Sequence, residues 1–280
     1  MKKINTISGG KTSAFISANY KSNYNVFALV RVDDKKCLFP DKKIRQIVED
    51  KIQKPFIGTL EDNTIIYTIL DLEQFIGKKI HWVSGITFDE VVKTKGGWLP
   101  NKLHRYCTTH LKMQPLFKWW QKTINKPSEF RIGFRANEQS RAKNTLSKTN
   151  KNGFLEMKTI IGKRGSRNKW GLVEWQKPVF PLIENNIFKD QIESYWKGKP
   201  VRFAWMNNCV GCFHKTPLLL KKMYQLHPNK MEWFEKQELN RNPRDGWKNH
   251  QRYKDIKNIN LQFELFETDF NDCDSGYCGI

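Results

Sequence analysis

The sequence lacks any apolar run that approaches the ~20 residues a helix needs to cross a membrane. It also lacks the apolar segment of a secretory signal peptide, because the polar residues 8–13 interrupt the N-terminal region. From these two absences we expect a cytoplasmic protein that does not act in a membrane. At 280 residues the chain is long enough to bury a full hydrophobic core.

Acidic residues are scarce relative to basic ones, with 28 Asp and Glu against 49 Lys and Arg and a net charge of +21. Such an excess favours a polyanionic partner or anionic substrates, the alternative being a solvated, lysine-rich surface. The segment 141–177, called the basic arm below, holds ten basic residues against Glu156 and Glu174, a net charge of +8. Trp170 and Trp175 lie in the same segment. Because basic side chains contact phosphates and aromatic ones stack on bases, we expect the arm to bind nucleic acid, either DNA or tRNA.

Cysteine is also sparse, with six residues in the chain. In an intracellular protein such cysteines favour metal or redox chemistry over disulfides. Cys209 and Cys212 form a Cys-x-x-Cys motif, a spacing at which two thiolates can face one metal. Together with Cys107 and one terminal cysteine, Cys278 rather than Cys273, they predict four ligands for a [4Fe–4S] cluster. Zinc and a redox dithiol are the alternatives.

A glycine-rich loop near the N-terminus is the most informative motif. It reads Ser8-Gly9-Gly10-Lys11-Thr12-Ser13. The loop follows the strand-like run 3–7 and precedes a helix-like run, so backbone N–H groups, the helix N-terminus and hydroxyls can surround a phosphate. The spacing fits neither a Walker A loop nor a dinucleotide-binding fingerprint. The motif predicts a nucleotide site, and the alternative is an ordinary strand-to-helix turn.

Strand-like and helix-like segments alternate along the first part of the chain. We expect strands over 3–7, 26–32, 64–70 and 129–134. We expect helices over 42–54, 111–122, 188–197, 217–225 and 229–240. This alternation favours an α/β fold, with a Rossmann-like, mostly parallel sheet flanked by helices and a smaller, mainly helical C-terminal region that contains cysteines. The segment 64–70 could instead extend through 71–75 as a helix.

The carboxyl ends of parallel strands form the edge at which ligands bind. We expect the glycine-rich loop, Asp33-Asp34 and the segment 133–141 to lie there. Arg135 stands just past the strand-end Gly133 and is suited to bidentate phosphate binding, the alternative being a surface turn in which it pairs with Glu138. We divide the chain into a nucleotide-binding α/β domain, 1–180, with the basic arm as an insertion, and a helical region, 181–280.

Four blocks, in this order and spacing, resemble one known family. They are Ser8–Ser13; Thr87-Phe88-Asp89-Glu90, Leu99-Pro100-Asn101, Arg105-Tyr106-Cys107-Thr108, Leu111-Lys112 and Pro115; Gly133-x-Arg135-Ala136-x-Glu138 with Arg141-Ala142; and Pro181-Leu182-Ile183 followed by Cys209-x-x-Cys212. The chain resembles the phosphoadenosine-phosphosulfate (PAPS) reductase-like branch of the PP-loop ATP pyrophosphatases. The resemblance implies ATP and Mg²⁺ at the loop, Lys112 near phosphate, Lys11 and Arg135 as catalytic groups, and an iron–sulfur cluster.

The sequence also departs from the family pattern. Thr12 stands where the loop usually has an acidic residue, and Gln139 stands where a serine usually follows Glu138. Cys278 has no glutamate before it and no histidine after Gly279, which disfavours sulfonucleotide reduction. The sequence therefore predicts an ATP pyrophosphatase-type enzyme that adenylates and then sulfurates a nucleic acid, as in DNA phosphorothioation or tRNA thiolation, with a sulfur-donor protein as partner. The alternatives are a sulfonucleotide reductase and a non-catalytic, nucleotide-sensing subunit that binds nucleic acid.

Overall fold

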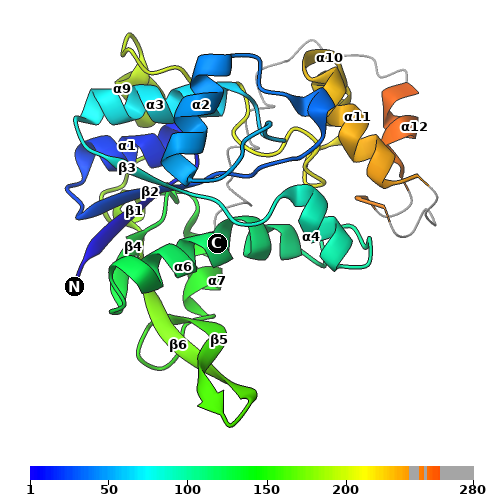
Figure 1. Cartoon of the computed structure of the whole chain (residues 1–280). Coiled ribbons are helices and arrows are strands. Elements are labelled where there is room, and N and C mark those ends of the chain that lie inside the picture. Colours follow the sequence, from blue (N-terminus) through cyan, green and yellow to red (C-terminus); the bar gives the residue numbers. More distant parts are fainter. Residues whose placement is uncertain (240–245, 249–250, 259–280) are drawn as a thin grey trace.

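The computed structural model describes residues 1–239, 246–248 and 251–258. Over this part of the chain one sheet has the strand order β3-β2-β1-β4-β6-β5 (Figure 1). The strands are β1 (Lys3–Ile7), β2 (Tyr24–Ala28), β3 (Ile80–Val83), β4 (Ser128–Arg131), β5 (Leu155–Arg164) and β6 (Arg167–Val179). All neighbouring strands are parallel except β5 and β6. The predicted α/β fold with a mostly parallel sheet is confirmed.

Helices cover both faces of this sheet. They are α1 (Lys11–Asn19), α2 (Lys42–Ile52), α3 (Thr64–Ile76), α4 (Phe88–Thr94), α5 (Tyr106–Thr108), α6 (Gln114–Thr123), α7 (Gln139–Leu146), α8 (Pro181–Glu184), α9 (Lys189–Trp196), α10 (Pro217–Leu226), α11 (Pro228–Gln237) and α12 (Tyr253–Asn258). A 3₁₀ turn spans Lys35–Cys37, and a π-helical turn, Thr109–Met113, leads into α6. In the described part of the chain, no helix is long and apolar enough to pass through a lipid bilayer.

Side chains alternate between the two faces along the central strands, as the two-residue period of a strand requires. Ile7 and Phe27 pack with α1, α2, α3 and α9 on one face. Ile4 and Val26 pack with α6 on the other face. Leu182 of α8 belongs to the first cluster, so packing joins the two sides of residue 180. The division of the chain into two domains at this residue stays a prediction.

Most predicted elements are present with boundaries shifted by a few residues, but the expected third strand over 64–70 is wrong. That segment forms the start of α3, and the sheet instead takes β3 from residues 80–83. Ile65, Ile69 and Leu72 are buried along one face of α3, at the spacing of a helix. The many β-branched residues in this run hid the helical period, although the helical alternative for the segment was correct.

The basic arm folds into α7 and the β5–β6 hairpin, which extends away from the body of the protein (Figure 1). Trp175 lies at the base of β6 and is 1 % exposed. It packs edge-on against Phe117 and Phe130 in the core beneath α6. The expectation that Trp175 stacks on bases is therefore wrong, because the fold needs this ring in its interior. Trp170 is 57 % exposed on the hairpin.

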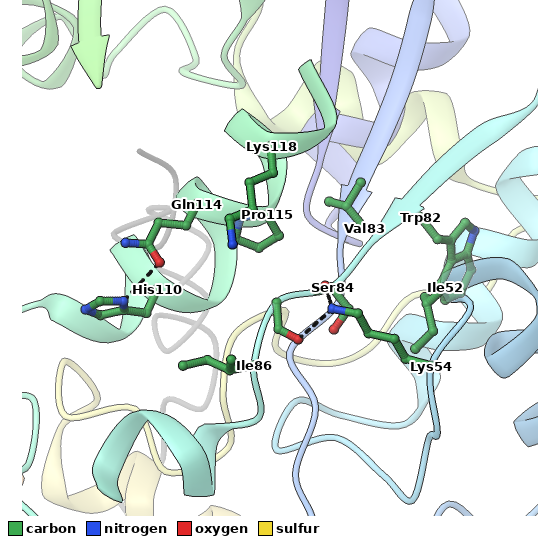
Figure 2. A pocket seen from close by; sticks show the side chains of 11 residues that line it. Ile52, Lys54, Trp82, Val83, Ser84, Ile86, His110, Gln114, Pro115 and Lys118 are labelled. Atoms are coloured by element: carbon green, nitrogen blue, oxygen red, sulfur yellow. Dashed lines mark hydrogen bonds between the residues drawn. The ribbon is translucent and has the colours of Figure 1, made fainter. Parts of the chain in front are cut away.

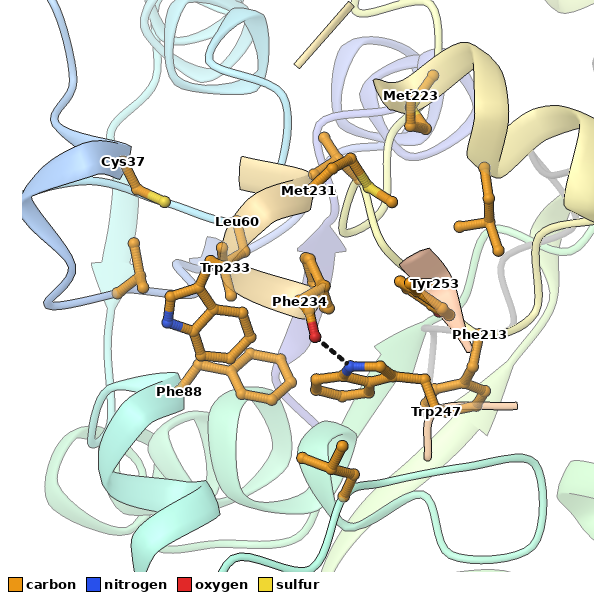
Figure 3. Packing of buried hydrophobic residues seen from close by; sticks show 14 of the residues in the cluster. Cys37, Leu60, Phe88, Phe213, Met223, Met231, Trp233, Phe234, Trp247 and Tyr253 are labelled. Atoms are coloured by element: carbon orange, nitrogen blue, oxygen red, sulfur yellow. Dashed lines mark hydrogen bonds between the residues drawn. The ribbon is translucent and has the colours of Figure 1, made fainter. Parts of the chain in front are cut away.

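A second core lies beneath the C-terminal helices. Trp233, Phe234, Trp247 and Tyr253 pack against one another and against Phe88 of α4 (Figure 3). The indole N–H of Trp247 donates to the backbone oxygen of Phe234 at 2.8 Å. This cluster supports the loop that carries the Cys-x-x-Cys motif, since the hydroxyl of Tyr253 donates to the backbone oxygen of Gly211 at 2.9 Å.

Candidate functional site

The glycine-rich loop lies at the point where the strand order of the sheet reverses. The chain proceeds from β1 to β2 and β3 on one side, and β4 and β6 lie on the other side of β1. Ligands bind in the crevice at such a switch point. A Cβ atom on Gly133, which follows β4, would lie 3.3 Å from Cγ2 of Thr12 and 3.7 Å from the backbone nitrogen of Ser13. The structure thus brings together the two segments that the sequence assigned to this edge.

Hydrogen bonds within the loop hold it in a tight turn. The backbone N–H of Ser8 donates to Oγ of Ser13 at 3.1 Å, and that hydroxyl lies 3.1 Å from the backbone oxygen of Gly10. Gly9 has φ +83°, a conformation that favours glycine. No side chain caps the N-terminus of α1, so its first N–H groups remain available to an anion.

Gly10 lies against Asn207, in the C-terminal half of the chain. A Cβ atom there would lie 1.9 Å from Nδ2 and 2.9 Å from Cγ of Asn207. Gly10, Lys11 and Asn207 also line a common cavity of about 190 Å³, together with Glu193. The loop therefore opens onto a hollow whose far wall comes from the segment before the Cys-x-x-Cys motif.

Lys11, a predicted catalytic residue, is held at this cavity by α9. Its ammonium forms an ion pair with Glu193, and its backbone oxygen accepts the indole N–H of Trp196 at 3.0 Å. Both side chains of the ion pair are about one-third exposed. A phosphate in the cavity would compete with Glu193 for the ammonium of Lys11.

Arg135, the other predicted catalytic residue, is 4 % exposed. Its backbone N–H and its Nε both donate to Oε2 of Glu138, at 2.8 and 3.0 Å. The second oxygen of Glu138 pairs with Arg141, whose guanidinium lies 4.2 Å from the centre of the Phe134 ring. The pairing of Arg135 with Glu138, expected as an alternative, is thus present in a buried turn. It uses Nε and leaves the two terminal nitrogens of the guanidinium for another acceptor.

Cys107, Cys209 and Cys212 line one small cavity of about 30 Å³, so the structure places these predicted ligands together. Backbone hydrogen bonds fix the motif: the N–H of Cys212 donates to the oxygen of Cys209 at 3.0 Å, and the N–H of Val210 donates to Leu60 at 2.8 Å. Gly211 is required by close packing, because a Cβ atom there would lie 2.4 Å from ring atoms of Phe234.

Thiolates are suitable donors for zinc or for an iron–sulfur cluster, and both need four ligands. Three of the predicted ligands line the cavity, and Cys278, like Cys273, lies outside the described residues. Within the described ranges, no three or more His, Cys, Asp or Glu side chains are grouped closely enough to hold a metal ion. The donors fit a metal in kind, but among the described residues the three thiols are not grouped closely enough to ligate one ion, and the [4Fe–4S] cluster stays a prediction.

Two buried lysines beside the cysteine cavity were not anticipated. The ammonium of Lys215 donates to Asn208 and to the backbone oxygen of Cys209, the latter at 2.6 Å. Lys230 donates to the backbone oxygen of Glu61 and to Asn63. Burial lowers the pKa of Lys230 to about 8, although nearby acidic groups act in the opposite direction. Nothing in the local sequence marks either lysine as buried.

Lys112, which was expected near phosphate, contacts a buried carboxylate, and its role at a phosphate stays a prediction. Its ammonium lies 2.9 Å from Oε1 of Glu61, whose side chain is 1 % exposed. Among the described residues, Oε2 of Glu61 has no hydrogen-bond partner. Glu61 directly follows Leu60, which accepts from the N–H of Val210 in the Cys-x-x-Cys motif. Lys112 and Glu61 thus form a charged pair beside the cysteine loop.

A larger hollow of about 350 Å³ lies beyond the carboxyl end of β3 (Figure 2). Its polar lining includes Lys54, His110 and Lys118 and contains no carboxylate. The ammonium of Lys54 donates to the backbone oxygens of Ser84 and Gly85, at 2.6 and 3.2 Å. Burial, followed by the charges of nearby cations, lowers the pKa of Lys54. The hollow is electropositive, lies at the same sheet edge as the loop, and has the size of a small-molecule site.

Asp33 and Asp34, which were expected at the carboxyl edge of the sheet, contact α4 and α11. Asp33 accepts from the hydroxyl of Thr87 at 2.5 Å, and Asp34 lies 3.8 Å from the ammonium of Lys236. Cys37, near the same contacts, is 2 % exposed. Its burial raises the pKa of the thiol to about 12, which keeps it protonated and unreactive.

Comparisons with known proteins found little at the level of sequence. No protein-family model matches the chain, and no curated protein matches it. Among solved structures, the chain is similar to PAPS reductase from Candida auris in its phosphate complex, with a TM-score of 0.37 and 12 % identity over 72 % of this chain and 75 % of that chain. The strand order and the switch point establish the α/β fold from this chain itself.

Proposed function

We propose that the chain is a PP-loop enzyme that binds ATP at Ser8–Ser13, cleaves it between the α- and β-phosphates, and adenylates and then sulfurates a nucleic acid. The observation that carries the proposal is that one short segment, residues 207–209, reaches both the glycine-rich loop and the cysteine cavity. Asn207 contacts the loop at Gly10, and Cys209, two residues later, lines the cysteine cavity. A nucleotide held by the loop would lie close to the thiols.

The loop and α1 would bind the pyrophosphate part of ATP through backbone N–H groups. Lys11 would turn from Glu193 to the phosphates, and the terminal nitrogens of Arg135 would donate to a phosphate across the switch point. Mg²⁺ would neutralise charge on the phosphates. Because Thr12 replaces an acidic residue, the loop itself offers a hydroxyl rather than a carboxylate, and the phosphates would contribute most of the ligands of this ion.

Cys107, Cys209 and Cys212 would bind a metal centre together with a terminal cysteine, and a [4Fe–4S] cluster there would supply a site for sulfur. Two lysines place positive charge beside these thiols. Lys215 contacts the backbone of Cys209, and Lys230 is close enough for its charge to interact with that of Cys209.

A sulfonucleotide reductase is the second candidate, because thiols beside a nucleotide loop also suit attack on a nucleotide-bound sulfate. The products distinguish the two functions. We expect anaerobically purified protein to release pyrophosphate from ATP when a nucleic-acid acceptor is present, and to release AMP as well when sulfide is added as the sulfur nucleophile that displaces it. The Gly10→Val variant should release neither. Release of sulfite from a sulfonucleotide would favour the reductase. Binding of ATP without turnover would favour a nucleotide-sensing subunit.

A further inference from the structure

The outer part of the β5–β6 hairpin is a two-stranded ribbon that extends beyond the rest of the sheet. At its base, residues 176–179 of β6 pair with β4. Farther out, from the Glu156–Glu174 pair to the Arg164–Arg167 pair, the two strands pair with each other. At about 3.3 Å per residue, the part of β6 between Glu174 and Arg167 projects roughly 23 Å. Figure 1 shows the β5–β6 hairpin extending away from the body of the protein.

The outer part of the hairpin is basic and contains no acidic residue. Between Met157 and Val173 the basic residues are Lys158, Lys163, Arg164, Arg167 and Lys169, and all five are exposed. The two acidic residues of the arm lie at its base, where the amide of Asn150 donates to Glu156 at 3.1 Å and to Glu174 at 2.6 Å. The positive charge of the outer part is therefore not balanced within the hairpin.

The same outer part exposes large apolar side chains. They are Ile160, Ile161, Trp170 and Leu172, which are 44, 49, 57 and 63 % exposed. Ile160 is paired directly with Trp170, and Lys158 is paired with Leu172. Because directly opposed residues of an antiparallel pair share a face, these two pairs lie on one face of the ribbon. Exposed apolar side chains beside basic ones mark an interaction surface rather than a solvated turn.

We propose that this hairpin enters the major groove of a DNA duplex, with the basic residues contacting phosphates and the Trp170 face contacting base edges. The major groove of B-form DNA, about 12 Å wide, admits a two-stranded ribbon, whereas the major groove of A-form RNA is too narrow. Binding of a single strand would need several exposed aromatic side chains on which successive bases stack. Trp175, the second tryptophan of the basic arm, is buried and cannot serve in this way. The inference rests on the proposed function in one respect, the nucleic-acid acceptor, and identifies that acceptor as duplex DNA.

The test uses the full chain and fluorescence anisotropy with a DNA duplex of about two helical turns (~21 bp), the matching single strand and an RNA duplex of the same sequence. The test variant carries Lys163→Glu, Arg164→Glu and Arg167→Glu. The control carries Lys42→Glu, Lys43→Glu and Lys78→Glu, which changes the net charge equally at exposed positions on and beside α2 and α3. We expect the hairpin variant to lose at least roughly tenfold in duplex affinity and to reduce the salt slope by about 2.7, at ~0.9 for each lost phosphate contact. The control should keep both values near those of the wild type.

Two further measurements separate groove entry from attraction to phosphates. Trp170→Ala should weaken duplex binding by roughly tenfold while leaving the salt slope unchanged, because it removes contact with base edges and no charge. Bound protein should also protect guanine N7, which lies in the major groove, from methylation by dimethyl sulfate. An unprotected N7 or an unaffected Trp170→Ala variant would overturn the groove assignment.

The proposal is overturned if the single strand or the RNA duplex binds as tightly as duplex DNA, or if the control variant loses as much affinity as the hairpin variant. It is also overturned if sedimentation shows that the hairpin changes alter the oligomeric state, which would make a second copy of the chain the occupant of this surface. Thermal stabilisation by ATP is measured on the same proteins. Its absence in the wild type would contradict the proposed nucleotide function while leaving the result on DNA to be judged separately.

Discussion

Replacing Gly10 with valine should abolish binding of ATP while leaving the protein folded. A Cβ atom at this position would lie 1.9 Å from Nδ2 of Asn207, which lines the same cavity, so the valine must displace either Asn207 or the backbone of the loop. At a ligand concentration 100 times the dissociation constant, binding stabilises the native state by about 2.7 kcal/mol. In a chain of this size that corresponds to an increase of roughly 5–10 °C in Tm. We expect this increase in the wild type and none in Gly10→Val.

Two control variants separate the steric effect from a general loss of stability. Gly162 has no atom within 4 Å of its added Cβ, so Gly162→Val should respond to ATP as the wild type does. Asn207→Ala, combined with Gly10→Val, should recover part of the ~1–3 kcal/mol of stability lost through overpacking, because it removes the side chain that the valine meets. The double variant should still fail to respond to ATP. An equal increase in Tm for the wild type and Gly10→Val, measured by differential scanning fluorimetry, would refute the assignment of the loop.

Three other predictions follow from the site. Glu193→Gln should tighten ATP binding by up to about fivefold in calorimetry, because it frees Lys11 from a partly exposed ion pair worth at most ~1 kcal/mol; unchanged or weaker binding would mean that Lys11 does not contact the nucleotide. Protein purified without oxygen should be brown, with about four irons and four sulfides per chain, whereas colourless protein with about one zinc would replace the cluster with a structural metal. The pKa of Lys230 falls from 10.5 unfolded to about 8 folded, so the unfolded state binds more protons between these values and stability should rise from pH 8 to 10.5. In urea titrations Lys230→Met should lack this rise, and an equal rise in both proteins would show that another group causes it.

The sequence predicted the features that depend on local pattern and failed where packing decided. The strand-loop-helix motif at residues 3–19 and α9 were anticipated from periodicity and glycine position, while the role of the cysteines as metal ligands stays a prediction. The strand expected over 64–70 was wrong. A short run of β-branched residues fits the two-residue period of a strand as well as the 3.6-residue period of a helix, and only its packing against the sheet decides between them.

The candidate site also contains residues that no local signal could identify. Asn207 contacts Gly10 only through the fold, although its position just before the Cys-x-x-Cys motif was visible in the sequence. Lys215 and Lys230 look like surface residues in a lysine-rich chain and become buried through packing of the C-terminal helices. Trp170 and Trp175 looked equivalent in the sequence. In the fold, Trp175 lies at the base of β6 and is buried in the core, whereas Trp170 lies farther out on the hairpin and is exposed.

The most direct test of the account asks whether ATP and the cysteines share one site. Cys107 and Cys209 are partly exposed, whereas Cys37 is buried and serves as an internal reference. Alkylation of metal-free protein by iodoacetamide, followed at each cysteine by mass spectrometry, should slow at Cys209 when ATP and Mg²⁺ are added. In Gly10→Val the nucleotide should have no effect. An alkylation rate at Cys209 that ATP leaves unchanged in the wild type, under conditions where ATP raises its Tm, would contradict the claim that the nucleotide loop and the cysteine cavity form a single site.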